Sequence, residues 1–198
     1  MTGNMLPKPG EYDHGLRPYK YPELEVFFGM YPATKVVQAV TAGIHSQLLV
    51  QVCRMMRAKN IVELGSGTGV GTAALADYCV SVGGHLTSVD IGETIAKSKL
   101  GHRPEITFVV SDSVSYADRW QGPVDVVYVD SDHSRRHALN ELNGWLRHGP
   151  RMFLMDDTLD PNDPHGSPLE AALDFCAQHS WTWCNIPVGT GLAILLPR

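Results

Sequence analysis

The chain has 198 residues, of which 43% are hydrophobic, and its formal net charge is −5. This length and hydrophobic content suit one α/β domain with a proper core and exclude a largely disordered protein. An acidic chain without a run of Lys or Arg disfavours nucleic acid or an anionic membrane as the main partner. No apolar run approaches the roughly 20 residues of a membrane span, and the N-terminus lacks a signal-peptide core, so we expect a cytoplasmic protein.

Residues 1–33 form a segment with its own composition. The segment is too rich in proline for a long helix and too rich in Tyr and Phe for a disordered tail. We expect it to pack on the rest of the chain, on the partner in a homodimer, or over a substrate pocket as a lid. Residues 34–198 would then form the main domain.

Alternating helices and strands are predicted for the main domain. Apolar residues at helical spacing over residues 34–58 predict one or two helices. Five strands follow, with helices between them, at residues 60–65, 85–90, 105–110, 124–130 and 151–156. Near-continuous apolar strands are typical of a parallel sheet covered by helices on both faces. The sheet is therefore predicted to be doubly wound.

The C-terminal part of the chain predicts a hairpin. A helix over residues 168–179 begins at a capping box with Ser167 as the N-cap. Strands at residues 181–188 and 192–196 are only three residues apart, so the last strand must run antiparallel to its neighbour. The sequence thus predicts an α/β fold with a mostly parallel, seven-stranded sheet and a C-terminal antiparallel hairpin.

The first predicted strand runs into a loop with glycine at every second position, Glu63-Leu64-Gly65-Ser66-Gly67-Thr68-Gly69. Glycine permits positive φ and close approach of a ligand to the backbone, and amides at the following helix start attract electronegative atoms. The loop is therefore predicted to hold a nucleotide-like ligand. The dinucleotide fingerprint G-x-G-x-x-G fails, because Val70 takes the third position counted from Gly65 and Thr72 takes it counted from Gly67. A nicotinamide oxidoreductase is thus disfavoured.

The residues that close the next strands are unusually acidic. In open α/β sheets the ligand lies beyond the carboxyl ends of the strands. Asp90, followed by Ile91, ends the second strand, where a carboxylate can accept hydrogen bonds from both ribose hydroxyls of a nucleotide. Asp112 and Ser113 follow the third strand, and there capping of a helix is the alternative to ligand binding.

Three further carboxylates end the fourth and fifth strands, namely Asp130 and the pair Asp156 and Asp157. Adjacent parallel strands lie about 4.8 Å apart, so these carboxylates are expected at one spot. Such a cluster repels itself unless it is protonated or bound to a cation, and hard oxygen ligands select Mg²⁺, with Ca²⁺ or Mn²⁺ as alternatives. The competing interpretation is that Asp156 and Asp157 cap a loop and point apart.

Two histidines follow Asp130. His133 is expected at the start of the next helix, where its ring can reach the space above the metal. An unperturbed pKa of about 6.5 suits histidine to take a proton from a hydroxyl that a metal has made more acidic. The alternative is a histidine that only caps or decorates the helix start. His137 has no H-E-x-x-H context and is predicted to lie on the helix surface.

The glycine loop, an acidic residue and a hydrophobe followed by G-x-G-x-G, resembles motif I of the class I S-adenosylmethionine (SAM) methyltransferases. A parallel sheet that ends in an antiparallel hairpin is also similar to that Rossmann-like fold, and the resemblance covers residues from about 44 to 198. It implies SAM as the cofactor, Glu63 near its methionine ammonium, and Asp112 and Ser113 at its adenine. The expected cofactor contacts are Glu63, Gly65, Ser66, Gly67, Thr68, Gly69, Asp90, Ile91, Asp112 and Ser113.

The pattern Asp-x-x-His followed by Asp-Asp at the next strand end resembles the metal-dependent small-molecule O-methyltransferases. Catechol O-methyltransferase-like enzymes have a lysine where this chain has His133 and an asparagine where it has Asp157. Both departures are similar to the sugar O-methyltransferases of macrolide-antibiotic biosynthesis. The resemblance implies methyl transfer to a hydroxyl of a small molecule, with metal on Asp130, Asp156 and Asp157 and His133 as general base.

Three alternatives stay open. One is a metal-independent SAM methyltransferase whose acid cluster binds an amine acceptor. Another is a SAM-binding scaffold without activity of its own. The least favoured is a nicotinamide oxidoreductase.

Overall fold

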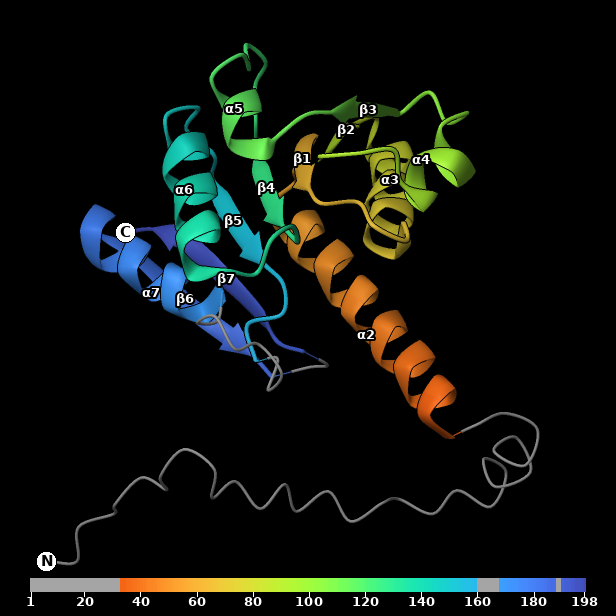
Figure 1. Cartoon of the computed structure of the whole chain (residues 1–198), viewed down its shortest axis with the longest axis horizontal. Coiled ribbons are helices and arrows are strands. Elements are labelled where there is room, and N and C mark those ends of the chain that lie inside the picture. Colours follow the sequence, from red (N-terminus) through yellow and green to blue (C-terminus); the bar gives the residue numbers. More distant parts are fainter. Residues whose placement is uncertain (1–32, 160–167, 188–189) are drawn as a thin grey trace, which may run out of the picture. The chain divides into compact units, whose positions relative to one another are not determined.

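The computed structural model describes residues 33–159, 168–187 and 190–198, with side chains described from residue 44 onward. The chain divides into two compact units, residues 1–39 and 40–198, and the sheet belongs to the second (Figure 1). The proposed lid or dimer segment, residues 1–33, lies outside the described residues apart from Ala33, as does the expected cap Ser167.

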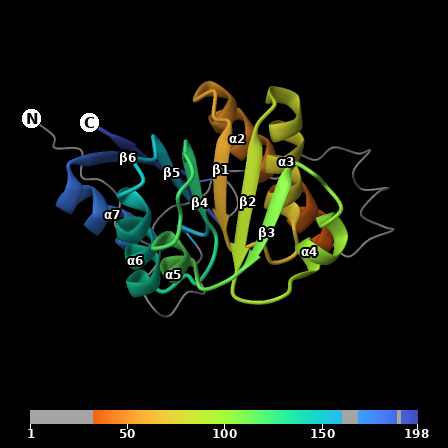
Figure 2. The same ribbon diagram turned by 90° about the horizontal axis from the view of Figure 1, so that it is seen from above.

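Seven strands form one sheet in the order β3-β2-β1-β4-β5-β7-β6 (Figure 2). They are β1 (Asn60–Leu64), β2 (His85–Asp90), β3 (Ile106–Val110), β4 (Val126–Val129), β5 (Met152–Met155), β6 (Trp181–Ile186) and β7 (Leu192–Pro197). Strand β7 pairs antiparallel with both β5 and β6, and the other neighbours are parallel. The predicted fold class, including the C-terminal hairpin, is confirmed.

The hairpin connection is longer than predicted. Strand β6 ends at Ile186 instead of residue 188, because Pro187 has no N–H to donate to the ladder. Five residues therefore separate β6 from β7, where the sequence predicted three.

The helices lie on both faces of the sheet. They are α2 (Ala33–Met55), α3 (Val70–Val82), α4 (Ile95–Leu100), α5 (Ser113–Ala117), α6 (Arg135–Leu146) and α7 (Pro168–His179). A single helix, α2, occupies the segment for which one or two were predicted. Side chains cap three of the helices: the N-caps of α4, α5 and α6 are Thr94, Asp112 and Ser134, each accepting a bond from a backbone N–H in the first turn. Helix α3 instead begins at Gly69, without a side-chain cap.

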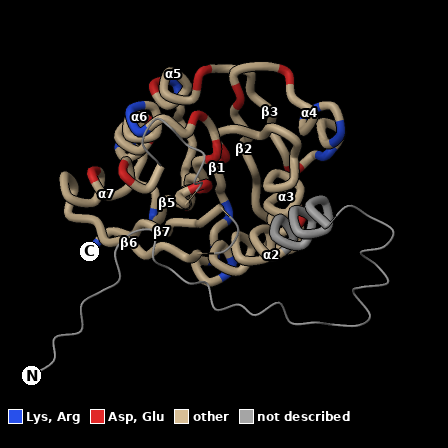
Figure 3. Tube along the Cα trace, turned by 60° about the horizontal axis from the view of Figure 1, so that its bottom comes forward, with Lys and Arg blue, Asp and Glu red and all other residues tan. Residues whose placement is uncertain are grey.

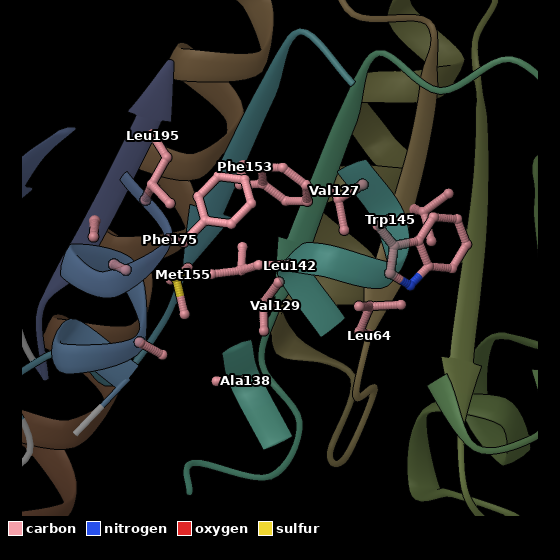
Figure 4. Close-up of a cluster of buried hydrophobic side chains, with 14 of the residues drawn as sticks. Leu64, Val127, Val129, Ala138, Leu142, Trp145, Phe153, Met155, Phe175 and Leu195 are labelled. Carbon is pink, nitrogen blue, oxygen red and sulfur yellow. The ribbon is translucent and has the colours of Figure 1, made fainter. Parts of the chain in front are cut away.

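Alternation along the strands divides the core into two clusters. Odd-numbered residues of β4 and β5 pack under α6 and α7, and their even-numbered neighbours pack toward α2 and α3. Figure 4 shows part of the first cluster, in which Leu142 and Trp145 of α6 and Phe175 of α7 cover the sheet. Each fully buried side chain of this size contributes about 1.5–3 kcal/mol. This packing holds the strand ends in fixed positions.

The strand register brings four chain segments to one edge of the sheet. Leu64 of β1 pairs with Val89 of β2 on one side and with Val129 of β4 on the other. Val129 in turn pairs with Met155 of β5. The residues that come next lie together at this edge: Asp90, which ends β2, and Gly65, Asp130 and Asp156, which directly follow β1, β4 and β5. Figure 3 shows acidic residues gathered near the end of β1.

No helix in the described part of the chain has the length and apolar character needed to cross a bilayer.

Candidate active site

The loop between β1 and α3 depends on glycine. Gly65, Gly67 and Gly69 have φ angles of 87°, 42° and 89°, in the left-handed region that side chains disfavour. At Gly65 a Cβ atom would lie 2.0 Å from the main-chain oxygen of Asp130. The loop therefore packs its bare backbone against the chain that leaves β4, and this contact requires glycine.

Asp90 connects the glycine loop to the end of β2. Its Oδ2 accepts a hydrogen bond of 2.8 Å from the Ser66 N–H and a weaker one of 3.4 Å from the Gly67 N–H. Its Oδ1 accepts a bond of 3.4 Å from the Gly92 N–H. The carboxylate thus orders the loop in addition to any contact with a ligand.

A cavity of about 550 Å³ opens beyond the carboxyl ends of β1, β2, β3 and β4. This volume lies within the range of small-molecule and cofactor sites. It is lined by Gly65, Gly67, Val89, Asp90, Ile91, Ser111, Asp112, Ser113, Asp130, Ser131, Asp132 and His137.

The structure places the expected cofactor residues in two groups. Six line the cavity, namely Gly65, Gly67, Asp90, Ile91, Asp112 and Ser113. Glu63, Ser66, Thr68 and Gly69 are not among its lining residues, and of these Ser66 and Gly69 are buried within the loop. Asp112 also caps α5, with its Oδ1 2.7 Å from the Ser115 nitrogen, so the two interpretations of Asp112 are compatible.

Glu63 lies under the glycine loop and is 1% exposed. Its Oε2 accepts hydrogen bonds of 2.8 Å from the Thr72 hydroxyl and 2.5 Å from the Ser88 hydroxyl. Burial raises the pKa of Glu63 to about 7, although the hydrogen bonds from the two hydroxyls lower it. Contact with a methionine ammonium stays a prediction, since the described hydrogen bonds of Glu63 join β1 to α3 and β2.

The buried carboxyl predicts a dependence of stability on pH. Because folding raises the pKa of Glu63 from 4.5 to about 7, its contribution is complete below pH 4.5 and is lost as the pH rises through 7. Relative to wild type, Glu63→Gln is expected to gain on the order of 3 kcal/mol of unfolding free energy between about pH 4.5 and 8. Urea denaturation at several pH values measures this, with exposed Glu93→Gln as the control. Identical pH dependence in wild type and Glu63→Gln would contradict it.

Asp130, His133 and Asp157 form a group that could hold a metal ion, with one ligand atom of each within 4.8 Å of the others. The Nε2 atom of His133 lies 3.1 Å from Asp157 Oδ2 and 4.0 Å from Asp130 Oδ1. Burial, followed by the charges of Asp156 and Asp157, raises the pKa of Asp130 well above its usual range. Such a carboxyl favours a nearby positive charge.

His133 lies before the first residue of α6, not within its first turn. Helix α6 starts at Arg135 with Ser134 as its N-cap, so His133 belongs to the connection after β4. His133 is therefore not the N-cap of α6, and its role as general base stays a prediction.

Asp156 was expected beside Asp130 and Asp157 as a metal ligand, but both of its oxygens have protein partners. Its Oδ1 lies 3.2 Å from His45 Nε2 on α2, and its Oδ2 accepts a 2.5 Å hydrogen bond from the Tyr128 hydroxyl. Burial would raise the pKa of Asp156, but the contact with His45 outweighs it and the pKa is lowered. The grouping of ligand atoms thus contains His133 in the place predicted for Asp156.

Strand alternation explains this difference. Asp156 continues the even-numbered residues of β5, Met152 and Leu154, which face α2, whereas Asp157 has a left-handed φ of 53° and turns the chain away. The Tyr128 hydroxyl also lies 3.3 Å from Asp130 Oδ2, so it bridges the two carboxylates from below.

Sequence reasoning missed Tyr128, His45 and the position of His137. Tyr128 could have been found, because it lies two residues before Asp130 and so faces the same side of β4. No sequence signal marks His45, whose contact depends on how α2 packs. His137 was predicted to lie on the helix surface, which is wrong: it is partly buried and lines the cavity.

The fold matches solved methyltransferase structures at low sequence identity. The SAH-bound methyltransferase PaMTH1 from Podospora anserina has a TM-score of 0.63 and 14% identity, with 100% of each chain covered. The O-methyltransferase TomG from Streptomyces achromogenes is involved in tomaymycin synthesis and was solved with SAM. It has a TM-score of 0.60 and 20% identity, and the match covers 77% of this chain and 79% of that chain. An O-methyltransferase from Bacillus cereus in complex with SAH has a TM-score of 0.58 and 17% identity, and the match covers 89% of this chain and 97% of that chain. At these identities the likeness shows the fold.

Residues 62–152 match the family model described as a methyltransferase domain. This match agrees with the methyltransferase fold of the similar solved structures. No curated protein matches the chain in sequence. The matched segment runs from β1 to the start of β5, so it contains the glycine loop, Asp90 and Asp130. The resemblance to the class I methyltransferase fold is confirmed, while the functions of individual residues stay predictions.

Proposed function

We propose that the protein transfers the methyl group of SAM to a hydroxyl group of a small molecule, assisted by a divalent cation. The observation that carries the proposal is the position of Asp130, which lines the cofactor cavity and also belongs to the group with His133 and Asp157. A methyl donor in the cavity would thus lie next to a base and to carboxylates. Two of the similar structures are O-methyltransferases.

The cavity has the chemistry that SAM requires. Gly67 lines the cavity and a Cβ atom there would meet no atom within 4 Å, so the backbone is open to a ligand, and the start of α3 has no side-chain cap. Asp90 presents a carboxylate at the end of β2, where ribose hydroxyls are commonly bound. SAM in this position would supply an electrophilic methyl group on a sulfonium.

The group beside the cavity also fits a cation. Asp130 and Asp157 offer the hard oxygen atoms that Mg²⁺, Ca²⁺ and Mn²⁺ prefer. The pKa of Asp130 is raised by burial and then by the charges of Asp156 and Asp157. A cation on these residues would supply positive charge that stabilises a deprotonated acceptor. Asp156 is a third ligand only if it gives up its contact with His45.

Proton removal is assigned to His133. As the acceptor oxygen bonds to the methyl carbon, the carbon–sulfur bond breaks, SAH leaves as a neutral thioether, and the hydroxyl proton passes to the imidazole. Holding the oxygen in line with the methyl group can contribute roughly 7–11 kcal/mol, and general-base help about 10²–10⁴-fold in rate. Positioning therefore dominates the expected rate enhancement.

A metal-independent reaction is the second candidate. The observation that favours it is the 3.1 Å contact between His133 and Asp157, in which the carboxylate can orient the ring without any ion. In that case the remaining carboxylates would suit an amine acceptor.

Removal of divalent cations separates the two candidates. Dialysis against EDTA is expected to abolish methyl transfer and to leave SAH binding unchanged, with activity restored by Mg²⁺, Ca²⁺ or Mn²⁺. Full turnover in EDTA would exclude the metal and support the second candidate. A panel of hydroxyl and amine acceptors, assayed by SAH release, tests the acceptor class; SAH binding without turnover on any acceptor would support a scaffold.

Isosteric substitutions test the ligand set. Asp157→Asn tolerates the left-handed conformation at this position, so it removes charge without backbone strain. The metal concentration needed for half-maximal activity should rise by about 10-fold or more, the effect typical of losing a metal ligand or a residue hydrogen-bonded to one. Asp156→Asn is the matched variant: an equal rise would make Asp156 a third ligand, whereas no rise would restrict it to holding His45 and Tyr128.

A further inference from the structure

One buried carboxylate organises a wall of the cofactor cavity. Glu141 of α6 is 0% exposed. Its Oε1 accepts hydrogen bonds from the Ser113 hydroxyl and, at 2.6 Å, from the Ser131 hydroxyl, and it lies 3.2 Å from His137 Nε2. The three partners all line the cavity and come from three segments, after β3, after β4 and on α6.

Burial of the second carboxylate oxygen of Glu141 lowers the stability of the fold. Oε2 is buried and accepts no hydrogen bond from the described residues. A buried carboxylate with an unsatisfied oxygen destabilises a fold, and a hydrophobic residue of similar volume is often at least as stable. Stability alone therefore does not account for a carboxylate that gathers three cavity residues.

The strand order tells which part of SAM faces His137. In the proposed use of SAM the ribose lies by Asp90 at the end of β2, and the methionine part with its methyl group extends toward the end of β4. Since β3 lies beyond β2 in the sheet, the adenine is left for the segment after β3. His137 Nε2 lies 3.3 Å from the hydroxyl of Ser113, which belongs to that segment.

With Nε2 turned to Glu141 and Ser113, Nδ1 is the ring nitrogen left to meet a ligand. We propose that His137 binds the adenine of SAM through Nδ1 and that Glu141 is the positioning residue that fixes this ring. The proposal rests on the proposed use of SAM but on neither the metal nor the acceptor.

The charges around the ring support a donor at Nδ1. The hydrogen bond with Glu141 raises the pKa of His137. Burial opposes this rise, and the charges of Glu141, Asp132 and Asp112 add to it. The protonated ring carries hydrogen on both nitrogens, and the ring nitrogens of adenine are acceptors.

Calorimetric titration with two probes tests the proposal. SAH contains adenine and the amino-acid part, whereas 5′-methylthioadenosine lacks the amino-acid part. His137→Ala and Glu141→Gln are each expected to weaken binding of both probes by about 10-fold, the loss of one hydrogen bond. His179→Ala is the matched control, because this histidine also pairs with a residue of α6, Asn143, but does not line the cavity. The control should bind both probes like wild type.

Kinetics separate positioning from a general structural effect. Both variants should raise KM for SAM by a similar factor while kcat at saturating SAM stays within about twofold. Because Glu141 acts through His137, the double variant should lose less than the product of the single losses. His137→Ala keeps the test decisive if Glu141→Gln does not fold.

Wild-type affinity for both probes in His137→Ala would overturn the proposal. So would a loss confined to SAH, because the ring would then face the amino-acid part. Wild-type protein that binds no SAH would overturn the proposed function as well, whereas turnover in EDTA or on amines alone would overturn only the proposed function.

Discussion

Replacing His133 by alanine is expected to lower kcat by about 10²–10⁴-fold, the contribution typical of a general base. Affinity for SAH should stay within about twofold, because His133 is not among the residues that line the cofactor cavity. Steady-state kinetics and calorimetry measure the two quantities. His179→Ala is the control for loss of an imidazole elsewhere in the fold.

Two further measurements distinguish a base from a metal ligand at this position. If His133 is the base, extra metal should not restore His133→Ala, and His133→Lys should recover part of the activity at high pH. Recovery of His133→Ala at high metal concentration would instead make His133 a ligand, as its grouping with Asp130 and Asp157 permits. Unchanged kcat in His133→Ala would remove the residue from the reaction.

Gly65→Ala is expected to have the largest effect on the fold of the site. The new Cβ would lie 2.0 Å from the Asp130 main-chain oxygen, and φ is 87°. The left-handed conformation costs an L-residue about 1–2 kcal/mol, and overpacking typically about 1–3 kcal/mol, so the free energy of unfolding should fall by roughly 2–5 kcal/mol. Binding of SAH should be lost with it, because the clash displaces both the loop and the chain after β4.

Gly83→Ala provides the matched comparison. Gly83 also has a positive φ, 62°, but a Cβ there meets no atom within 4 Å. This variant should lose only about 1–2 kcal/mol from backbone strain and should bind SAH normally. Urea denaturation and calorimetry check both variants. Equal destabilisation by the two substitutions would show that strain, and not the contact with Asp130, makes Gly65 necessary.

The sequence predicted the sheet well because each buried parallel strand is an apolar run between polar or glycine-rich turns. Local chemistry also explains the deviations: Pro187 ends β6 early, and the capping serine places the start of α6 after His133. The residues at strand ends were predicted to share one edge, and the register of β2, β1, β4 and β5 brings Asp90, Gly65 and Asp130 together there.

Side-chain partners at that edge were harder to predict. His137 was expected on the helix surface because the H-E-x-x-H motif that would give it a ligand role is absent. Its partner Glu141 lies one turn further along α6, and the bond to Ser113 depends on how α5 and α6 pack. Contacts between residues distant in sequence are set by that packing and leave no local pattern.

By itself the sequence determined the doubly wound sheet, the glycine loop that resembles motif I of the methyltransferases, and the acidic strand ends, since these follow from apolar periodicity and from glycine spacing. Only the tertiary structure decided which carboxylates act together. Asp156 meets His45 and Tyr128, whereas Asp157 meets His133, because successive residues at a strand end face opposite sides of the sheet and each side has its own helices.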